Sequence, residues 1–249
     1  MATLHLLGTG ASLSGPQRTT TMLAFEAEGS VVLVDCGGDA VQRLLAAGLD
    51  PGRIDLLILT HEHPDHVGAF PLLVQKLWLA KRGRPLPIRG PARALDQARR
   101  LFDTFDTSGW RGLPPFDWGE VAEEEGASVW SDERWRITAA PGSHGRTPTI
   151  AIRVETPTSP GVAAYSSDTE PADAIARLAR GATILVHEAT GRFRGHSDAA
   201  GAAGVAARAG AERLVLVHLP PAAEEADLSA ARARFPAIEL GRDGQQLTF

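Results

Sequence analysis

The stretch Thr60-His61-Glu62-His63-Pro64-Asp65-His66 is the most informative part of this chain. It follows the apolar run 54–59, which predicts a buried strand. Side chains placed where a strand ends are held firmly and are open to a cleft. Imidazole and carboxylate groups are the ligands that zinc prefers in catalytic sites. Because the chain has only eight histidines, three of them in this stretch favour a metal site over a solvated polar turn.

The spacing of these residues indicates what kind of metal site to expect. A zinc-protease pattern, His-Glu-x-x-His, would need a second histidine where Asp65 stands. Pro64 also disfavours the helix of that motif, because proline lacks an amide donor. A tight loop is expected instead. In an extended backbone His61 and His63 point the same way, whereas Asp65 and His66 follow a turn and reach another point. The stretch therefore predicts two metal ions.

The overall composition sets the class of protein. The chain has 249 residues, of which 43% are hydrophobic and 22% are charged, as in ordinary globular proteins. We expect one domain spanning residues 1–249. A formal net charge of −5 argues against nucleic-acid binding by charge alone. A lone cysteine, Cys36, suits a reducing compartment, and no targeting signal or membrane span is recognised, so we expect a cytoplasmic protein without a membrane partner.

Hydrophobic periodicity predicts alternating strands and helices. Strands are expected at 3–7, 22–27, 31–35 and 54–59, with helices at 40–47, 68–82 and 91–105. From residue 134 onward, strands at 134–139, 149–155, 162–166, 182–187 and 213–218 alternate with helices at 171–180 and 197–209. Ser197 and Gly210 are the expected caps of the last helix. This order predicts an α/β protein with two similar halves.

The histidine cluster resembles the signature His-x-His-x-Asp-His of the metallo-β-lactamase superfamily. Further matching residues follow in the family's order: His144 in Pro141-Gly142-Ser143-His144-Gly145, Asp168 in Tyr165-Ser166-Ser167-Asp168-Thr169, and His218 at the end of the apolar run 214–217. The resemblance implies a four-layer αβ/βα sandwich, in which two mixed sheets face each other, helices cover the outer faces, and the metals lie at one edge.

The resemblance also implies a set of ligands. The first metal would take His61, His63 and His144, the second would take Asp65, His66 and His218, and Asp168 would bridge them. Asp35 matches an aspartate that supports the metal-binding loop through hydrogen bonds. Its neighbour Cys36 is interpreted as packing. Zinc is the expected ion, and manganese or iron would also suit such ligands. Paired metals activate water, so hydrolysis is the implied reaction, and Asp65 could also accept a proton from that water.

Two other segments resemble the ribonuclease Z-like branch of this superfamily. They are His187-Glu188-Ala189-Thr190 with Gly195-His196-Ser197, and the opening Leu7-Gly8-Thr9-Gly10-Ala11-Ser12 with Arg18-Thr19-Thr20-Thr21. In that branch the glutamate and the second histidine, here Glu188 and His196, are implied to assist phosphate stabilisation and leaving-group protonation. His187 would be structural. The opening glycines do not form a dinucleotide-binding motif, because Leu13 occupies the third glycine position.

The chain also departs from the tRNA-processing members of that branch. Their basic, glycine-rich arm has no clear counterpart between residues 67 and 143, and the segment from Glu188 to His196 is short. Basic side chains are nevertheless frequent in residues 76–100: Lys76, Lys81, Arg82, Arg84, Arg89, Arg93, Arg99 and Arg100. They could contact a phosphate-bearing substrate, but a solvated helical face, neutralised in part by the acidic stretch 117–125, is the commoner explanation.

We therefore expect a metal-dependent hydrolase with two divalent ions that cleaves a phosphodiester in RNA or in a small molecule. The same fold could hydrolyse another ester, a thioester or a lactam, or could serve as a metal-bound binding protein without catalysis. Flavodiiron-like redox chemistry is disfavoured because position 63 keeps its histidine and no flavin domain is recognised. The resemblance also suggests a homodimer, although no interface can be recognised in the sequence.

Overall fold

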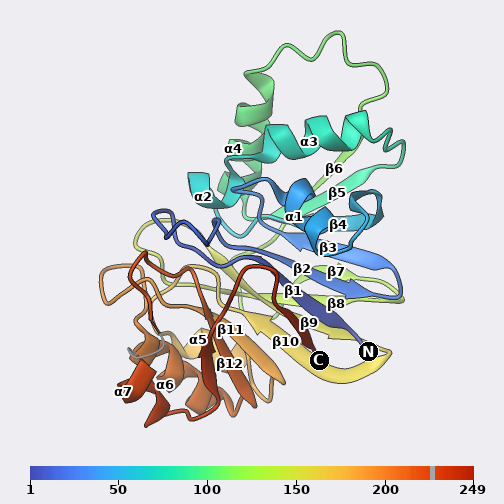
Figure 1. The fold of residues 1–249 in the computed structure, drawn as a ribbon. Helices are drawn as coiled ribbons and strands as arrows, with labels where there is room; N and C mark the ends of the chain where they lie inside the picture. The colour runs from blue at the N-terminus through green and yellow to red at the C-terminus, as the bar shows by residue number, and fades with distance from the viewer. Residues whose placement is uncertain (225–227) are drawn as a thin grey trace.

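Two facing β-sheets form the centre of the structure, a computed structural model that describes residues 1–224 and 228–249 (Figure 1). Within these residues each sheet has seven strands. The first sheet has the order β14-β1-β2-β3-β4-β5-β6, with β1 (Thr3–Gly8), β2 (Met22–Ala27), β3 (Ser30–Val34), β4 (Ile54–Ile58), β5 (Leu86–Gly90), β6 (Phe116–Glu120) and β14 (Gln246–Thr248). The second has the order β13-β12-β11-β10-β9-β8-β7, with β7 (Ala127–Ser131), β8 (Arg136–Pro141), β9 (Ile150–Thr156), β10 (Ser159–Tyr165), β11 (Ile184–Glu188), β12 (Arg213–Val217) and β13 (Ile238–Leu240).

Both sheets are mixed, as predicted. In the first sheet β1, β2 and β3 pair antiparallel, whereas β3, β4, β5 and β6 run parallel to one another. In the second sheet β7 to β10 pair antiparallel, and β10 to β13 run parallel. The carboxyl ends of neighbouring parallel strands lie at the same edge of a sheet. Residues that follow β10, β11 and β12 are therefore brought together.

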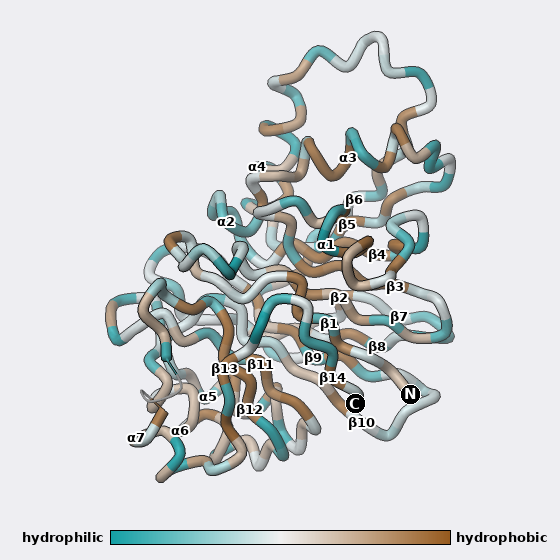
Figure 2. The backbone as a smooth tube through the Cα atoms, in the orientation of Figure 1, coloured by the Kyte–Doolittle hydropathy of each residue, from teal (hydrophilic) through white to brown (hydrophobic). Residues whose placement is uncertain are grey.

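A hydrophobic core fills the space between the two sheets. Alternate strand residues such as Leu4 and Leu6 point into it, as the two-residue period of a strand requires. Trp135 is fully buried there, and its indole Nε1–H donates a hydrogen bond to Oγ of Ser30, 2.8 Å away. Figure 2 shows hydrophobic stretches along the central strands, including β3, β4, β11 and β12, and more hydrophilic connections. Burial of these stretches holds the two sheets together.

Helices cover the outer face of each sheet and complete the four predicted layers. On the first sheet these are α1 (Ala40–Ala46), α3 (Phe70–Leu79) and α4 (Ala92–Asp103), and on the second they are α5 (Asp173–Leu178), α6 (Ala199–Ala209) and α7 (Ser229–Arg232). Two short helical turns, η1 (Pro51–Arg53) and α2 (Pro64–Val67), lie on either side of β4. A separate hydrophobic cluster lies beneath each group of covering helices. Among the described residues, no helix is long and apolar enough to cross a lipid bilayer.

Several sequence expectations about helix ends were wrong. Asp198, and not Ser197, caps α6, because its side chain accepts a hydrogen bond from the amide of Gly201. Gly210 ends that helix as expected, with a left-handed φ of 62°. The helix expected at 91–105 extends too far: α4 stops at Asp103, so Phe105 lies beyond the helix and is 57% exposed. Strands β5, β6, β7, β13 and β14 were not expected.

Candidate metal centre

The histidine cluster follows β4 and ends in a one-turn helix. His61 lies beyond the strand, and His63 has the extended backbone of a helix N-cap, with φ −65° and ψ 150°. Pro64 then begins α2, which carries Asp65 and His66. The sequence had predicted a tight loop at residues 61–66. Proline is well suited to the first turn of a helix, where its missing amide is not needed, so Pro64 starts this helix instead of preventing it.

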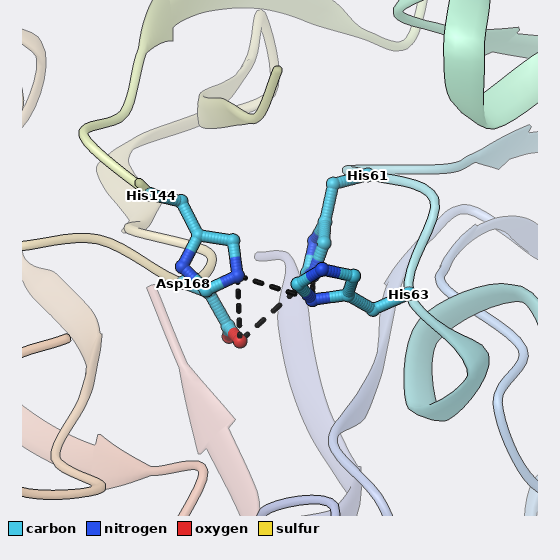
Figure 3. Close-up of side chains that lie close together, drawn as sticks. All are labelled: His61, His63, His144 and Asp168. Carbon is cyan, nitrogen blue, oxygen red and sulfur yellow. Dashed lines mark hydrogen bonds and ion pairs between the residues drawn. The ribbon is translucent and has the colours of Figure 1, made fainter. Parts of the chain in front are cut away.

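Three imidazole nitrogens converge on one point. Nδ1 of His63 lies 3.2 Å from Nε2 of His61 and 3.1 Å from Nε2 of His144. Figure 3 shows His61 and His63 approaching from one side, His144 from another, and the Asp168 carboxylate below them. Its Oδ2 lies 3.8 Å from Nε2 of His61 and 3.9 Å from Nε2 of His144. Two nitrogens bound 2.0–2.1 Å from a tetrahedral zinc ion stand about 3.3 Å apart, so this spacing suits a metal ion.

A second group of ligand atoms lies on the other side of Asp168. Nε2 of His218 is 3.2 Å from Oδ2 of Asp65 and 3.4 Å from Oδ2 of Asp168. Nε2 of His66 is 3.5 Å from Oδ1 of Asp168 and 3.7 Å from Oδ2 of Asp65. In each group, one ligand atom per residue lies within 4.8 Å of the others. The structure thus brings together all seven residues that the resemblance proposed as ligands, and Asp168 stands between the two groups.

Unpartnered polar atoms in this cluster support its interpretation as a metal site. Nε2 of His66 and Oδ1 of Asp168 are buried and accept or donate no hydrogen bond within residues 1–224 and 228–249. A buried polar atom without a partner costs free energy, about 1–3 kcal/mol. A cation between His66 and Asp168 would satisfy both atoms. The residues present therefore fit divalent metal ions.

Asp35 holds the first ligand segment in place. Its Oδ2 lies 2.8 Å from Nδ1 of His66 and also accepts a hydrogen bond from the hydroxyl of Thr60, at 2.8 Å. Its Oδ1 accepts from the backbone amide of Thr60, again at 2.8 Å. Since Nδ1 of His66 is engaged by a carboxylate, Nε2 is left for the metal. The carboxylate therefore fixes the orientation of the His66 ring, and its role in supporting a metal ligand stays a prediction.

Other ligands are oriented by groups outside the cluster. Nδ1 of His144 lies 2.7 Å from the carbonyl oxygen of Gly195, which can only accept, so this nitrogen carries the proton. Thr190 donates its hydroxyl proton to the carbonyl of His218, 2.9 Å away, and accepts from Nδ1 of His218, 2.5 Å away. In both His144 and His218, Nδ1 is thereby engaged outside the cluster, and Nε2 faces the cluster.

Burial and neighbouring charges shift the pKa of several groups in the cluster. Burial lowers the pKa of His61 well below its ordinary value, and nearby His66 lowers it further. Burial acts in the same direction on the pKa of His63. For Asp168 burial raises the pKa, but the charges of His218 and His66 outweigh it and hold the pKa well below its usual range. Burial lowers the pKa of His66, but the charges of Asp168 and Asp35 outweigh it, so its pKa is raised well above its ordinary value. His61 and His63 therefore favour the neutral imidazole and Asp168 the carboxylate, which are the forms that coordinate metal ions.

Three residues at this site have an unusual backbone conformation. Asp35, Ser167 and His218 adopt left-handed φ angles of 61°, 51° and 54°. Each follows a strand, β3, β10 or β12, at the point where the chain turns into the site. Such conformations cost about 1–3 kcal/mol and persist where the surrounding structure enforces them, most often at functional sites. The backbone strain is therefore concentrated at residues whose conformation orients the candidate ligands or the side chains that support them.

Glu188 and His196 form the pair predicted beside the metals. Glu188 is completely buried at the end of β11, and its Oε1 lies 2.9 Å from Nδ1 of His196. Burial lowers the pKa of His196, but the hydrogen bond and charge of Glu188 outweigh it, so the pKa is raised. A ligand atom of His196 also lies within 4.8 Å of those of Asp168 and His218. The preceding His187 is fully buried, as expected of a structural residue.

A cavity of about 490 Å³ opens over the cluster. It is lined by residues from both halves of the cluster, including Asp65, Asp168 and His196. Two lining residues that the sequence analysis did not identify are Leu13 and Phe193, both exposed. The available signal was their position, since Leu13 follows the glycine-rich opening and Phe193 lies between the two glycines of the segment 191–195.

These features define a class of αβ/βα sandwich proteins with a metal centre at one edge. The model of the beta-lactamase superfamily domain matches residues 31–219. A ribonuclease Z of Mycobacterium marinum is 31% identical, with 98% of this chain and 97% of that protein covered. A ribonuclease Z of Methanothermobacter thermautotrophicus is 28% identical, with 98% and 95% covered. The solved structure of human tRNase Z, short form, has a TM-score of 0.81 at 23% identity, covers 99% and 98% of the two chains, and supports the fold.

This chain belongs to the metallo-β-lactamase superfamily, within its ribonuclease Z-like branch. The alignment with the archaeal relative spans 302 positions, whereas this chain has 249 residues. That relative therefore contains segments that this chain lacks.

Proposed function

We propose that this protein is a metal-dependent hydrolase that cleaves phosphodiester bonds, and that seven clustered side chains hold its ions. The observation that carries the proposal is the position of Asp168, whose carboxylate lies 3.4–3.9 Å from ligand nitrogens of both groups. A carboxylate in this position can be shared by two ions, and paired ions are common in enzymes that act on phosphate esters.

We assign a set of ligands to each ion. His61, His63 and His144 would hold the first ion, Asp65, His66 and His218 would hold the second, and Asp168 would serve both. Five imidazoles and two carboxylates suit zinc, and such a set also accepts manganese or iron. Bound divalent ions supply Lewis acidity and make water a better nucleophile near neutral pH.

Asp65 and His196 would move protons in the reaction. Asp65 lies at the cavity, with its side chain 10% exposed, and can orient an attacking water and accept its proton. His196 is held through Nδ1 by Glu188, which leaves Nε2 to face the departing oxygen. Because Glu188 raises the pKa of His196, it favours the protonated imidazole, which can donate a proton. Phosphodiesters need such an acid when the leaving group is an alkoxide.

The substrate is proposed to be a small phosphodiester or the end of an RNA chain. The relatives named ribonuclease Z make RNA a candidate. However, no lysine or arginine of the described residues lines the cavity. Of the basic residues in 76–100, five form ion pairs with acidic side chains: Lys76, Arg84, Arg89, Arg93 and Arg99. Because their charges are paired within the protein, these five residues are less available to bind the phosphates of a long polyanion.

A substrate panel tests this proposal. We expect the metal-loaded protein to hydrolyse bis(p-nitrophenyl) phosphate or cyclic nucleotides, and to lose that activity on treatment with a chelator. Precursor tRNA, compared at equal concentration, would separate RNA processing from action on small molecules. Turnover of carboxylic esters, thioesters or lactams without phosphodiester hydrolysis would refute the proposal. A metal-loaded protein inert toward every substrate would indicate a binding protein.

The domain organisation, oligomeric state and location of the protein are tested separately. We propose a single domain over residues 1–249, a homodimer in solution and a cytoplasmic location. Light scattering would measure the mass in solution, and a mass of one chain would refute the dimer. Fractionation of cells producing the tagged protein would test the location.

A further inference from the structure

Two exposed apolar side chains stand at the mouth of the metal-site cavity. Leu13 is 76% exposed and Phe193 is 54% exposed. Of the large hydrophobic side chains that are exposed in residues 1–224 and 228–249, these two alone line that cavity. Exposed apolar groups at a cleft rimmed by polar residues commonly mark a ligand-binding surface. Burial in the hydrophobic core therefore does not explain where Leu13 and Phe193 lie.

The loop that carries Phe193 holds the aromatic ring in a defined place. The amide of Gly191 donates to the carbonyl of Ser197 at 2.9 Å, and the amide of His196 donates to the carbonyl of Phe193 at 3.0 Å. Gly191 has a φ of 144°, and a Cβ at that position would lie 3.1 Å from Cε1 of Phe193. The ring thus packs closely against the backbone of its own loop, which limits its motion.

One side of the Phe193 ring contacts the proposed proton donor. Its centroid lies 4.7 Å from that of His196, with the planes inclined by 45°. His196 in turn lies parallel to His218, with an interplanar angle of 7° and a centroid distance of 5.8 Å. A group that rests on Phe193 would therefore be next to the atoms where a phosphate ester is expected to react.

The other wall of the cavity is also apolar and anchored. Leu13 lies there with Pro220 and Pro221. The amide of Ala11 donates to the carbonyl of Leu219 at 3.0 Å, so the two wall segments are tied together. A planar, partly apolar group would fit between such a wall and an aromatic ring. A cavity of about 490 Å³ has the size of a small-ligand pocket.

We propose that Phe193 is a stacking surface for the nucleobase of a nucleoside-containing phosphodiester, and so helps to select the substrate. The inference rests on the proposed phosphodiesterase function. Base–aromatic stacking contributes substantially to nucleotide binding and tolerates any base, because every base has a π face. Of the two exposed arginines that flank Phe193, Arg192 pairs with Asp198 at 3.2 Å, and Arg194 adds positive charge to the loop.

Calorimetric titration of the metal-loaded protein with two ligands tests the proposal. Adenosine 5′-monophosphate and ribose 5-phosphate share the sugar and the phosphate, and differ by the base. We expect the wild-type protein to bind the nucleotide at least about tenfold more tightly, and Phe193→Ala to abolish most of that preference. Phe193→Trp should keep it, whereas Phe193→Leu, which is apolar but not planar, should lose it. Phe105→Ala is the matched control, because Phe105 is 57% exposed but does not line the cavity.

Each result separates this inference from the proposed function. Equal binding of the two ligands, no binding of the nucleotide, or an unchanged preference in Phe193→Ala would overturn the inference, even if bis(p-nitrophenyl) phosphate is hydrolysed. A preference kept by Phe193→Leu would also overturn it, since a general apolar contact would then suffice. A Phe193-dependent preference in a protein that hydrolyses no phosphodiester would support base stacking and refute the proposed reaction.

Discussion

The two halves of the metal centre are built in different ways. The first sheet supplies its residues from one continuous segment after β4, residues 61–66, supported by Asp35 at the end of β3. The second sheet supplies single residues from separate places in the chain: His144, Asp168, Glu188, His196 and His218. The first half can therefore be recognised as a motif in the sequence. The residues of the second half come together only when the strand ends meet in the folded protein.

The support of the two halves differs as well. The first half is tied to a neighbouring strand end by backbone contacts, since the amide of Cys36 donates to the carbonyl of His66 at 2.7 Å. Gly37 allows this approach, because a Cβ there would lie 1.7 Å from the carbonyl oxygen of Asp65. The second half relies on contacts between loops, such as that of His144 with Gly195. We expect substitutions in the two halves to have different consequences.

The largest effect is expected at Asp168, which lies between the two groups of ligand atoms. Asp168→Asn removes a charge that lies between both groups of ligand nitrogens. Loss of a group that merely supports a ligand typically costs 10- to 100-fold, so we expect activity on bis(p-nitrophenyl) phosphate to fall by more than about a hundredfold. Elemental analysis should show a reduced metal content.

The control for this substitution is Asp173→Asn on α5, which removes a carboxylate whose side chain is 76% exposed. It should leave activity and metal content unchanged. Full metal content and activity in Asp168→Asn would show that the two groups of ligands do not share this carboxylate.

A more selective effect is expected at His196, in the second half. His196→Ala should lower turnover by about 10²- to 10⁴-fold for a phosphodiester with an alkoxide leaving group, because that group needs a proton. For a p-nitrophenyl ester the loss should be much smaller, because p-nitrophenolate departs without protonation. Measured turnover of the two esters, with metal content determined in parallel, tests this. Equal losses for both esters would argue against His196 as the proton donor.

Asp35→Asn should weaken the first half by a moderate amount. Asparagine tolerates the left-handed φ of 61° at this position, so the backbone should be preserved. The amide cannot replace both carboxylate oxygens that accept from Thr60 and hold His66. We expect metal affinity to fall by about 10- to 100-fold, measured by competition with a chelator. An unchanged affinity would mean that local backbone contacts alone orient His66.

The smallest effect is expected at the cap of α6, which covers the second sheet. Asp198→Ala removes the side chain that accepts from the amide of Gly201, and should lower the free energy of unfolding by about 1 kcal/mol. Asp198→Asn is the control, since asparagine caps helices equally well. Urea denaturation would measure both. A loss in Asp198→Asn as large as that in Asp198→Ala would show that the charge of Asp198, which pairs with Arg192 at 3.2 Å, and not the cap, stabilises this region.

The regular core elements could be predicted because burial imposes a period on the sequence. Strands β1, β2, β3 and β4 and helix α6 were expected close to where they lie. Strand β6 was missed because its residues, such as Asp117 and Trp118, are only partly buried or exposed and show no clear alternation. Strands β13 and β14 are each three residues long, too short for a period to be recognised. Phe193 was missed because it lies in an irregular loop, where its position between two glycines is the only signal and no period marks it.

The sequence by itself determined the chemistry of the first half, because His61, His63, Asp65 and His66 are neighbours in the chain and local backbone geometry aims them. Its resemblance to the superfamily also indicated which distant residues are candidate ligands: His144, Asp168 and His218. Only the tertiary structure decided that Asp168 stands between the two groups and that Phe193 borders the same cavity. The physical reason is that these positions depend on the packing of two sheets, which places strand ends more than a hundred residues apart in the chain within a few ångströms of one another.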